Sequence, residues 1–143
     1  MFLFEAARAQ LVSEVVEPGL SRGAIVILDR FADSTVAYQG YARGIDLGAI
    51  RTLNEIATRG HSPDLTVLLD IDVQIGLDRK LGEFGRDAIG KEHRAFHERV
   101  RAGYLALAAA ETQRWVVLDA ALPPDTLANQ IWKAVAPLLE GSR

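Results

Sequence analysis

The sequence predicts an α/β protein built on a parallel sheet with helices on both faces. Three short runs of β-branched and aliphatic residues lack alternation, which indicates strands buried on both faces. Helical patterns separate these runs, and each run ends at or beside an aspartate. The predicted strands are Ala24–Leu28, Leu65–Ile71 and Trp115–Leu118, and the aspartates are Asp29, Asp70 and Asp119. Open α/β sheets place ligands at the carboxyl ends of their strands, so we expect the site there.

Helices are predicted before, between and after these strands. Phe4, Ala7, Leu11 and Val15 repeat at helical spacing, and we expect this helix to end at Pro18-Gly19. The later helices are expected at Leu47–Thr58 (closed by Gly60), Val73–Leu81, His93 to about Ala110, and Asp125–Leu139. The resulting order, α-β-α-β-α-α-β-α, is typical of right-handed crossovers in a parallel sheet. The polar, glycine-containing stretch Gly82–Gly90 predicts a mobile loop.

Length and composition limit the class of protein. The 143 residues suit a single domain, 1–143, and 49% hydrophobic residues exclude a disordered chain. The net charge of −3 argues against nucleic acid as a partner, and the lack of cysteine excludes thiolate chemistry. The sequence shows no basic leader, and no apolar run approaches the roughly 18 residues of a membrane helix. We therefore expect a soluble, cytoplasmic protein without a membrane partner.

Three motif matches carry little weight. Gly19–Gly23 fits the nucleophile elbow G-x-S-x-G, but a helix is expected before it and a strand after it, the reverse of the required context. Gly85–Lys91 fits the start of a phosphate loop, yet Glu92 replaces the hydroxyl residue that holds magnesium. His93 and His97 are spaced as a metal pair without an evident third ligand, so we interpret them as a solvated helix face.

The most informative stretch, Asp29–Gly44, begins where the first predicted strand ends. Arg30 and Arg43 supply guanidinium groups, whose planar fork suits phosphate. Hydroxyl, aromatic and amide groups suited to a nucleobase or sugar follow, from Ser34, Thr35, Tyr38 and Gln39. An alternative interpretation makes Asp29 a helix cap and Arg30 its structural partner. Phe4 and Arg8 lie four residues apart on one helix and also allow two interpretations. In the first, Phe4 stacks on a base and Arg8 binds a phosphate. In the second, Phe4 belongs to the core and Arg8 to the surface.

Several motifs together resemble bacterial thymidylate kinase, from about residue 2 to about residue 135. They are F-x-A-A-R-x-Q at Phe4–Gln10, I-L-D-R-F at Ile27–Phe31, S-T-V-A-Y-Q-G at Ser34–Gly40, R-G-I-D at Arg43–Asp46, S-P-D-L-T-V-L-L-D at Ser62–Asp70, the Gly76–Arg79 segment, and F-H-E-R-V-R-A-G-Y-L-A-L-A at Phe96–Ala108. The resemblance implies the fold of P-loop nucleoside monophosphate kinases. It also implies transfer of the γ-phosphoryl group of ATP to dTMP, giving dTDP, with Mg²⁺.

The resemblance also implies roles for individual residues. Phe4 would stack on thymine, with Thr35 and Gln39 beside the base, and Tyr38 would crowd the 2′ position of the sugar. Arg8 and Arg30 would contact dTMP, with Arg30 on its phosphate, and Arg43 would add a second cation. Asp29 would help to organise phosphate and, indirectly, magnesium. Residues 82–92 would form the lid. Arg86 or Arg79 would stand in for the family's lid arginine, because Asp87–Gly90 replaces its D-R-x-E motif.

Against the family pattern, the 143 residues contain no first strand, no phosphate loop ending G-K-[ST]-[ST] and no second strand. We therefore expect an incomplete sheet that corresponds to the C-terminal two thirds of the family domain. The gap would lie between the predicted strands Ala24–Leu28 and Leu65–Ile71. A homodimer or a complementing N-terminal segment is the expected partner.

Several functions remain open. The sequence is compatible with a thymidylate kinase that is inactive as these 143 residues alone. It is also compatible with a non-catalytic module or partner subunit that binds dTMP or a related nucleotide, and with a decayed gene fragment. Another nucleoside monophosphate kinase is the alternative within the same class, although S-T-V-A-Y-Q-G argues against it.

Overall fold

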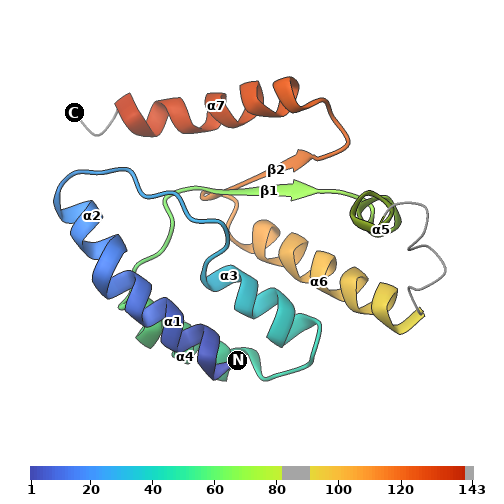
Figure 1. Cartoon of the computed structure of the whole chain (residues 1–143), viewed down its shortest axis with the longest axis horizontal. Helices are drawn as coiled ribbons and strands as arrows, with labels where there is room; N and C mark the ends of the chain where they lie inside the picture. The colour runs from blue at the N-terminus through green and yellow to red at the C-terminus, as the bar shows by residue number, and fades with distance from the viewer. Residues whose placement is uncertain (82–90, 141–143) are drawn as a thin grey trace.

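A computed structural model of the protein describes residues 1–81 and 91–140 (Figure 1). Two parallel strands lie among helices, so the α/β class is confirmed. The elements are α1 (Phe2–Leu11), the π-helix η1 (Val12–Val16), α2 (Glu17–Ser21), α3 (Ala32–Thr35), the π-helix η2 (Val36–Tyr41), α4 (Leu47–Thr58), β1 (Thr66–Asp70), α5 (Val73–Leu81), α6 (Lys91–Ala110), β2 (Trp115–Asp119) and α7 (Pro124–Glu140).

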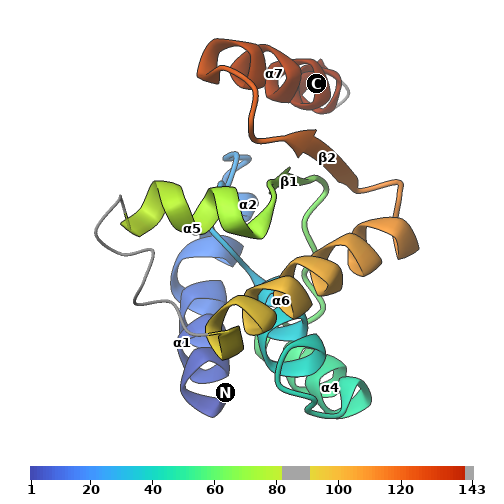
Figure 2. The same cartoon turned by 90° about the vertical axis from the view of Figure 1, so that its right-hand side faces the viewer.

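The helices form a layer on each face of the two-stranded sheet. Helix α7 lies on one face, whereas α1, α3, α4 and α6 lie on the other, and both views show this separation (Figures 1 and 2). β1 and β2 pair in register from Thr66 opposite Trp115 to Asp70 opposite Asp119. Both strands therefore end together, and helices α5 and α7 follow this edge.

The core fills the space between the sheet and the larger helical layer. One buried cluster joins Val36 and Ile50 to Leu107, Ala108 and Trp115. A second cluster packs η2 against α6 through Ala37, Ala42 and Val100. Gly103 of α6 is needed at this contact, since a Cβ there would lie 2.7 Å from the Cβ of Tyr41. The two clusters fix η2, and with it the candidate site, against α6.

Most predicted elements are confirmed with small shifts of their ends. The strands expected at Leu65–Ile71 and Trp115–Leu118 are β1 and β2, and the later helices correspond to α4, α5, α6 and α7. The Asp46 carboxylate accepts the Ala49 N–H at 2.8 Å and caps the start of α4. Helix α4 ends in left-handed backbone at Arg59 and Gly60, in agreement with the closing glycine.

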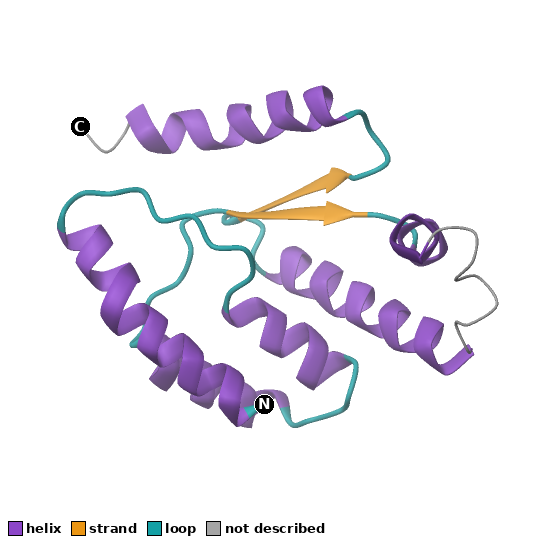
Figure 3. Cartoon of the chain, in the orientation of Figure 1, coloured by secondary structure: helices purple, strands orange, loops and turns teal. Residues whose placement is uncertain are grey.

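The strand predicted at Ala24–Leu28 is wrong for this structure, in which the segment is a loop (Figure 3). A strand is defined by a hydrogen-bonded neighbour, and within the described residues β1 pairs only with β2. Ile25 and Ile27 are 68% and 89% exposed, whereas Val26 and Leu28 are half-buried. The apolar composition favours a strand, but in the described structure the segment has no hydrogen-bonded neighbour and forms none.

The first helix does not end at Pro18-Gly19 as predicted. It continues through the π-helix η1 into α2 and ends at Ser21. A proline removes one N–H and crowds the preceding turn, and a π-turn is a known way to accommodate such a disturbance. The actual terminator is Gly23, whose φ of +72° is left-handed, with the Ala24 N–H bonded to the Gly19 carbonyl.

The helical stretch Ala32–Tyr41, formed by α3 and η2, was not predicted. Its short polar start hides the helical period. Among residues 1–81 and 91–140, no helix is long and apolar enough to cross a membrane.

Candidate functional site

The candidate site is built around Arg30, at the entry to α3. Arg30 has a φ of +69°, a left-handed conformation that is uncommon for a residue with a side chain. Such outliers persist where the surrounding structure enforces them, and they gather at functional sites. The exposed guanidinium lies over the Tyr38 ring, with its carbon 5.3 Å from the ring centroid. The backbone at this turn therefore positions a cation on an aromatic face.

An aromatic cluster supports this cation from η2 and α6. The Tyr38 ring meets Phe96 and Tyr104 edge-on, at centroid distances of 6.1 and 6.3 Å. The exposed Arg43 lies over Phe96 at 5.7 Å, so two arginines flank one group of rings. Stacking of guanidinium on aromatic rings leaves its N–H donors free to face outward.

Tyr104 connects this cluster to α3. Its hydroxyl lies 2.7 Å from the Ser34 Oγ. Burial raises the pKa of Tyr104 above its ordinary value, against the opposing effect of the Ser34 hydrogen bond. The hydroxyl therefore stays neutral and serves to hold α3 on α6. The sequence predicted neither the bond between Tyr104 and Ser34 nor the place of Phe96 in the aromatic cluster, because helical spacing indicates that Phe96 and Tyr104 are core residues.

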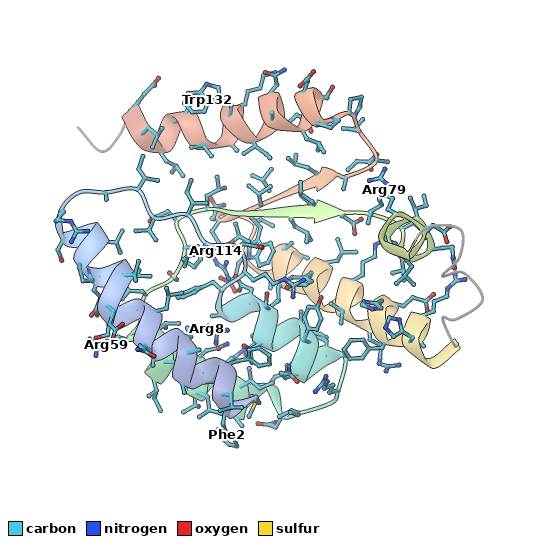
Figure 4. All side chains as sticks on the ribbon, viewed as in Figure 1. Phe2, Arg8, Arg59, Arg79, Arg114 and Trp132 are labelled. Atoms are coloured by element: carbon cyan, nitrogen blue, oxygen red, sulfur yellow. The ribbon has the colours of Figure 1, made fainter. Side chains whose placement is uncertain are left out.

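The Arg8 side chain is only 9% exposed and bonds to residues of α1, α3 and α4 (Figure 4). Its Nη1 donates to the Glu5 Oε2 at 2.6 Å and to the Asn54 Oδ1 at 2.9 Å. Its Nη2 donates to the Thr35 Oγ1 at 2.9 Å and to the Phe31 carbonyl at 3.2 Å. The roles of Glu5 and Asn54 were missed. In the sequence, only the spacing of Glu5 and Arg8, three residues apart on one helix, indicates the contact between Glu5 and Arg8.

Thr35 and Gln39 are both buried at the inner side of the site. Gln39 is 7% exposed, and its carboxamide takes part in no hydrogen bond within the described residues. Its amide atoms are not among the unpartnered polar atoms that are closed off from solvent, so they are accessible to a partner. This side chain is therefore a candidate for ligand contact.

The other predicted site residues are Phe4, Asp29, Arg79 and Arg86. Phe4 is 64% exposed on α1, so the four-residue spacing does not bury it beside Arg8. Asp29 is exposed just before Arg30. Arg79 of α5 donates to the Ala120 carbonyl at 2.9 Å, away from Arg8 (Figure 4). Arg86 lies outside the described residues, as do 82–90 of the lid-like stretch 82–92.

The aspartates at the strand ends are engaged in structural bonds. Arg101 holds both oxygens of Asp70, at 2.7 and 2.8 Å. These hydrogen bonds hold the pKa of Asp70 below its ordinary value, although burial acts in the opposite direction. Asp119 accepts the Ala121 N–H at 2.8 Å. Among the residues that the structure describes, no three histidine, cysteine or acidic side chains gather as a metal site; the rings of His93 and His97 lie 4.6 Å apart.

Comparison with known proteins identifies a group of similar chains. A sequence model of the family described as thymidylate kinase matches residues 1–131. The thymidylate kinase of Solidesulfovibrio magneticus is 50% identical over 146 residues, covering 97% of this chain and 70% of the relative. The thymidylate kinase of Thermomicrobium roseum is 46% identical, and the match covers 99% of this chain and 68% of the relative. The thymidylate kinase of Desulfovibrio desulfuricans is 48% identical, and the match covers 97% of this chain and 67% of the relative.

Proposed function

The chain belongs to the thymidylate kinase family, and from this membership we propose that its candidate site binds dTMP, the phosphoryl acceptor. The observation that carries the proposal is the pair of exposed arginines, Arg30 and Arg43, stacked over the rings of Tyr38 and Phe96. Free guanidinium donors suit the phosphate, and an adjoining aromatic surface suits the sugar and base.

The buried side of the site supports the same assignment. Thr35 and the Gln39 carboxamide, which has no partner in residues 1–81 and 91–140, offer hydrogen bonds to an uncharged base edge. The Tyr38 ring lies beneath the Arg30 guanidinium, and Tyr38 directly precedes Gln39, which suits a role beside the sugar. Phe4 is free to stack on the base, because its ring is exposed. Arg8 has its four terminal N–H groups bonded to protein, so its contribution to dTMP binding is through neighbouring groups or its Nε–H.

In the reaction of the family, a phosphate oxygen of dTMP attacks the γ-phosphorus of ATP, and the bond from that phosphorus to its bridging oxygen breaks to release ADP. Catalysis is mainly positioning and charge neutralisation. We assign Arg30 to hold the attacking phosphate, with Arg79 and Arg86 as candidates on the ATP side. Magnesium in such enzymes is held by one or two carboxylates and by substrate phosphates. The exposed Asp29 is a single carboxylate and does not form a resident metal site by itself, so we derive no step through the ion.

We propose that these 143 residues alone do not transfer the phosphoryl group. Their sequence contains no phosphate loop ending in G-K-[ST], whose backbone N–H groups and lysine cradle ATP. The same observation favours a second candidate function, a non-catalytic nucleotide-binding module or partner subunit. Two partners are proposed: a second copy on the exposed apolar side of α1, and a complementing strand on the open edge of β1.

Calorimetric titration with dTMP, with dCMP as the control ligand, tests the binding proposal. We expect the chain to bind dTMP selectively, and Arg30→Ala to weaken binding by about 1.5–3 kcal/mol, the usual contribution of hydrogen bonds to a charged group. The exposed Arg22, at the end of α2, is the matched control, and Arg22→Ala should leave the affinity unchanged. A folded chain without dTMP affinity contradicts the proposal, and dTDP formed from ATP by the pure chain contradicts the predicted inactivity.

A further inference from the structure

A carboxylate lies close to the cation that we assign to the phosphate. Asp33 is in the first turn of α3, three residues after Arg30. Burial is the main cause of the raised pKa of Tyr104, and among the charged side chains nearby Arg30 lowers this pKa and Asp33 raises it. Ser34, which follows Asp33, lies 2.7 Å from the Tyr104 hydroxyl. Arg30 and Asp33 therefore both lie near one tyrosine hydroxyl.

Arg114, the residue directly before β2, neutralises this carboxylate. Its Nη2 donates to the Asp33 Oδ1 at 2.7 Å, and its Nη1 donates to the Oδ2 at 3.0 Å. The two side chains are 17% and 14% exposed, so the pair is largely shielded from solvent. Further bonds, to the Thr66 hydroxyl at 2.9 Å and to Glu111 at 2.7 Å, fix the direction of the guanidinium. Both oxygens of Asp33 are therefore engaged by Arg114.

Anchoring of α3 gives a weaker account of this pair than charge does. Helix α3 and the residue before it also bond to Arg8 of α1, Asn54 of α4 and Tyr104 of α6, at 2.7 to 3.2 Å. The helix therefore has other anchors on three elements. By contrast, Asp33 has no second ion pair among the residues that the structure describes. Removal of Arg114 would leave α3 in place and would uncover a negative charge.

We propose that Arg114 is a positioning residue for phosphate binding: by engaging Asp33, it keeps this carboxylate from pairing with Arg30 and from repelling a bound phosphate. This inference rests on the proposed dTMP site. An aspartate without a cationic partner is ionised at neutral pH, and like charges a few ångströms apart oppose each other. An uncovered Asp33 and the phosphate of a nucleotide would therefore compete for one guanidinium. Arg114 acts on the phosphate through Asp33 and Arg30, without touching it.

The test compares calorimetric affinities for dTMP and for thymidine, which has the same base and sugar but no phosphate. All variants are made in the full 143-residue chain. We expect Arg114→Gln to weaken dTMP binding about tenfold, the effect of one charge several ångströms away, and to leave thymidine binding unchanged. Adding Asp33→Asn to Arg114→Gln should restore the dTMP affinity, because the uncovered charge is then gone. Arg114→Lys keeps the positive charge without the planar fork and should retain the dTMP affinity.

A matched control and a second variant keep the test decisive. Glu111 accepts from the same arginine but is exposed, so Glu111→Gln should leave the dTMP affinity unchanged. Circular dichroism checks that each variant folds. If Arg114→Gln does not fold, Asp33→Asn alone decides. Unchanged or tighter dTMP binding by Asp33→Asn supports the inference, whereas weaker binding overturns it, because that result assigns the pair to anchoring.

The outcomes separate this inference from the proposed function. A wild-type chain that binds no dTMP, or that binds dTMP and thymidine equally, overturns the proposed phosphate site and this inference with it. A wild-type chain that prefers dTMP, with an Arg114→Gln variant of the same preference, overturns this inference alone. Equal weakening of both ligands by Arg114→Gln also overturns it, as does a double variant that stays weak, because both results indicate a purely structural role.

Discussion

Half-buried and exposed arginines serve different purposes in this protein. Arg114 donates to both oxygens of Asp33, at 2.7 and 3.0 Å, and to the Thr66 hydroxyl at 2.9 Å. Burial lowers the pKa of Arg114, but its hydrogen bonds with Asp33 and Glu111 outweigh this effect and raise it. Arg114 therefore remains charged and ties β1 and β2 to α3. Arg30 and Arg43, stacked on rings at the surface, keep donors free for a ligand.

The paired carboxylate at the end of β1 makes stability depend on pH. The pKa of Asp70 is lower in the folded chain than its ordinary value, because Arg101 donates to both of its oxygens. The unfolded chain therefore binds more protons in acid, and the contribution of the pair is lost as the pH falls through the folded pKa. We expect this loss to begin near the ordinary aspartate value of about 4.

Urea unfolding of the wild-type chain and of Asp70→Asn at about pH 7, 5 and 3 measures this effect. These pH values lie on both sides of the ordinary aspartate pKa of about 3.9. The stability difference between the two chains should be constant from pH 7 to 5 and should shrink at pH 3. Asp64→Asn, which removes an exposed carboxylate before β1, is the control for general charge effects. A difference that does not change with pH contradicts the assignment.

The residue types of the candidate site are visible in the sequence, whereas their surroundings are not. Motifs identified Arg30, Thr35, Tyr38 and Gln39, and the structure gathers them on α3, η2 and the turn before α3. The burial of Arg8 was not predictable, because its partners Asn54 and Thr35 are distant in sequence and carry no local signal.

At the scale of elements, local pattern predicted what local interactions determine. The apolar periods of α4, α6 and α7 and the capping residue Asp46 are visible in sequence, and these helices formed nearly where expected. The segment 24–28 has a strand composition, yet strand formation depends on a partner that sequence composition does not reveal. In the same way, helical spacing identified the stripe on the first helix but not which side packs inward.

That stripe yields a prediction about α1 and η1. Leu11 and Val15 form an exposed apolar stripe, although their spacing suggested a core-facing side. Two copies of one apolar stripe can bury each other around a two-fold axis. We expect a homodimer by sedimentation velocity, and we expect Val15→Glu to convert it to a monomer. Trp132→Glu is the control, because Trp132 is an exposed apolar residue on α7, in the other helical layer (Figure 4). A Val15→Glu chain that remains dimeric contradicts this interface.

At the scale of the whole molecule, the sheet has an open edge. β1 has β2 on one side and no other strand among the described residues, while 24–28 lies outside the sheet as an extended apolar loop. An unpaired edge of this kind is a template for another strand. The alternation of exposed Ile25 and Ile27 with half-buried Val26 and Leu28 is the pattern of a strand without a neighbour.

Hydrogen exchange tests whether another strand completes the sheet. In the 143-residue chain, the N–H groups of Ile25 to Leu28 have no backbone acceptor among residues 1–81 and 91–140, so they should exchange at nearly the unfolded rate. The N–H groups that join β1 to β2 should be protected. Adding the part of the Solidesulfovibrio magneticus relative that the 70% match leaves uncovered, as a separate polypeptide, should protect both 24–28 and the open edge of β1.

Protection of 24–28 in the monomeric chain alone contradicts an open edge. Protection that appears only as the chain dimerises assigns the edge to a second copy and contradicts complementation.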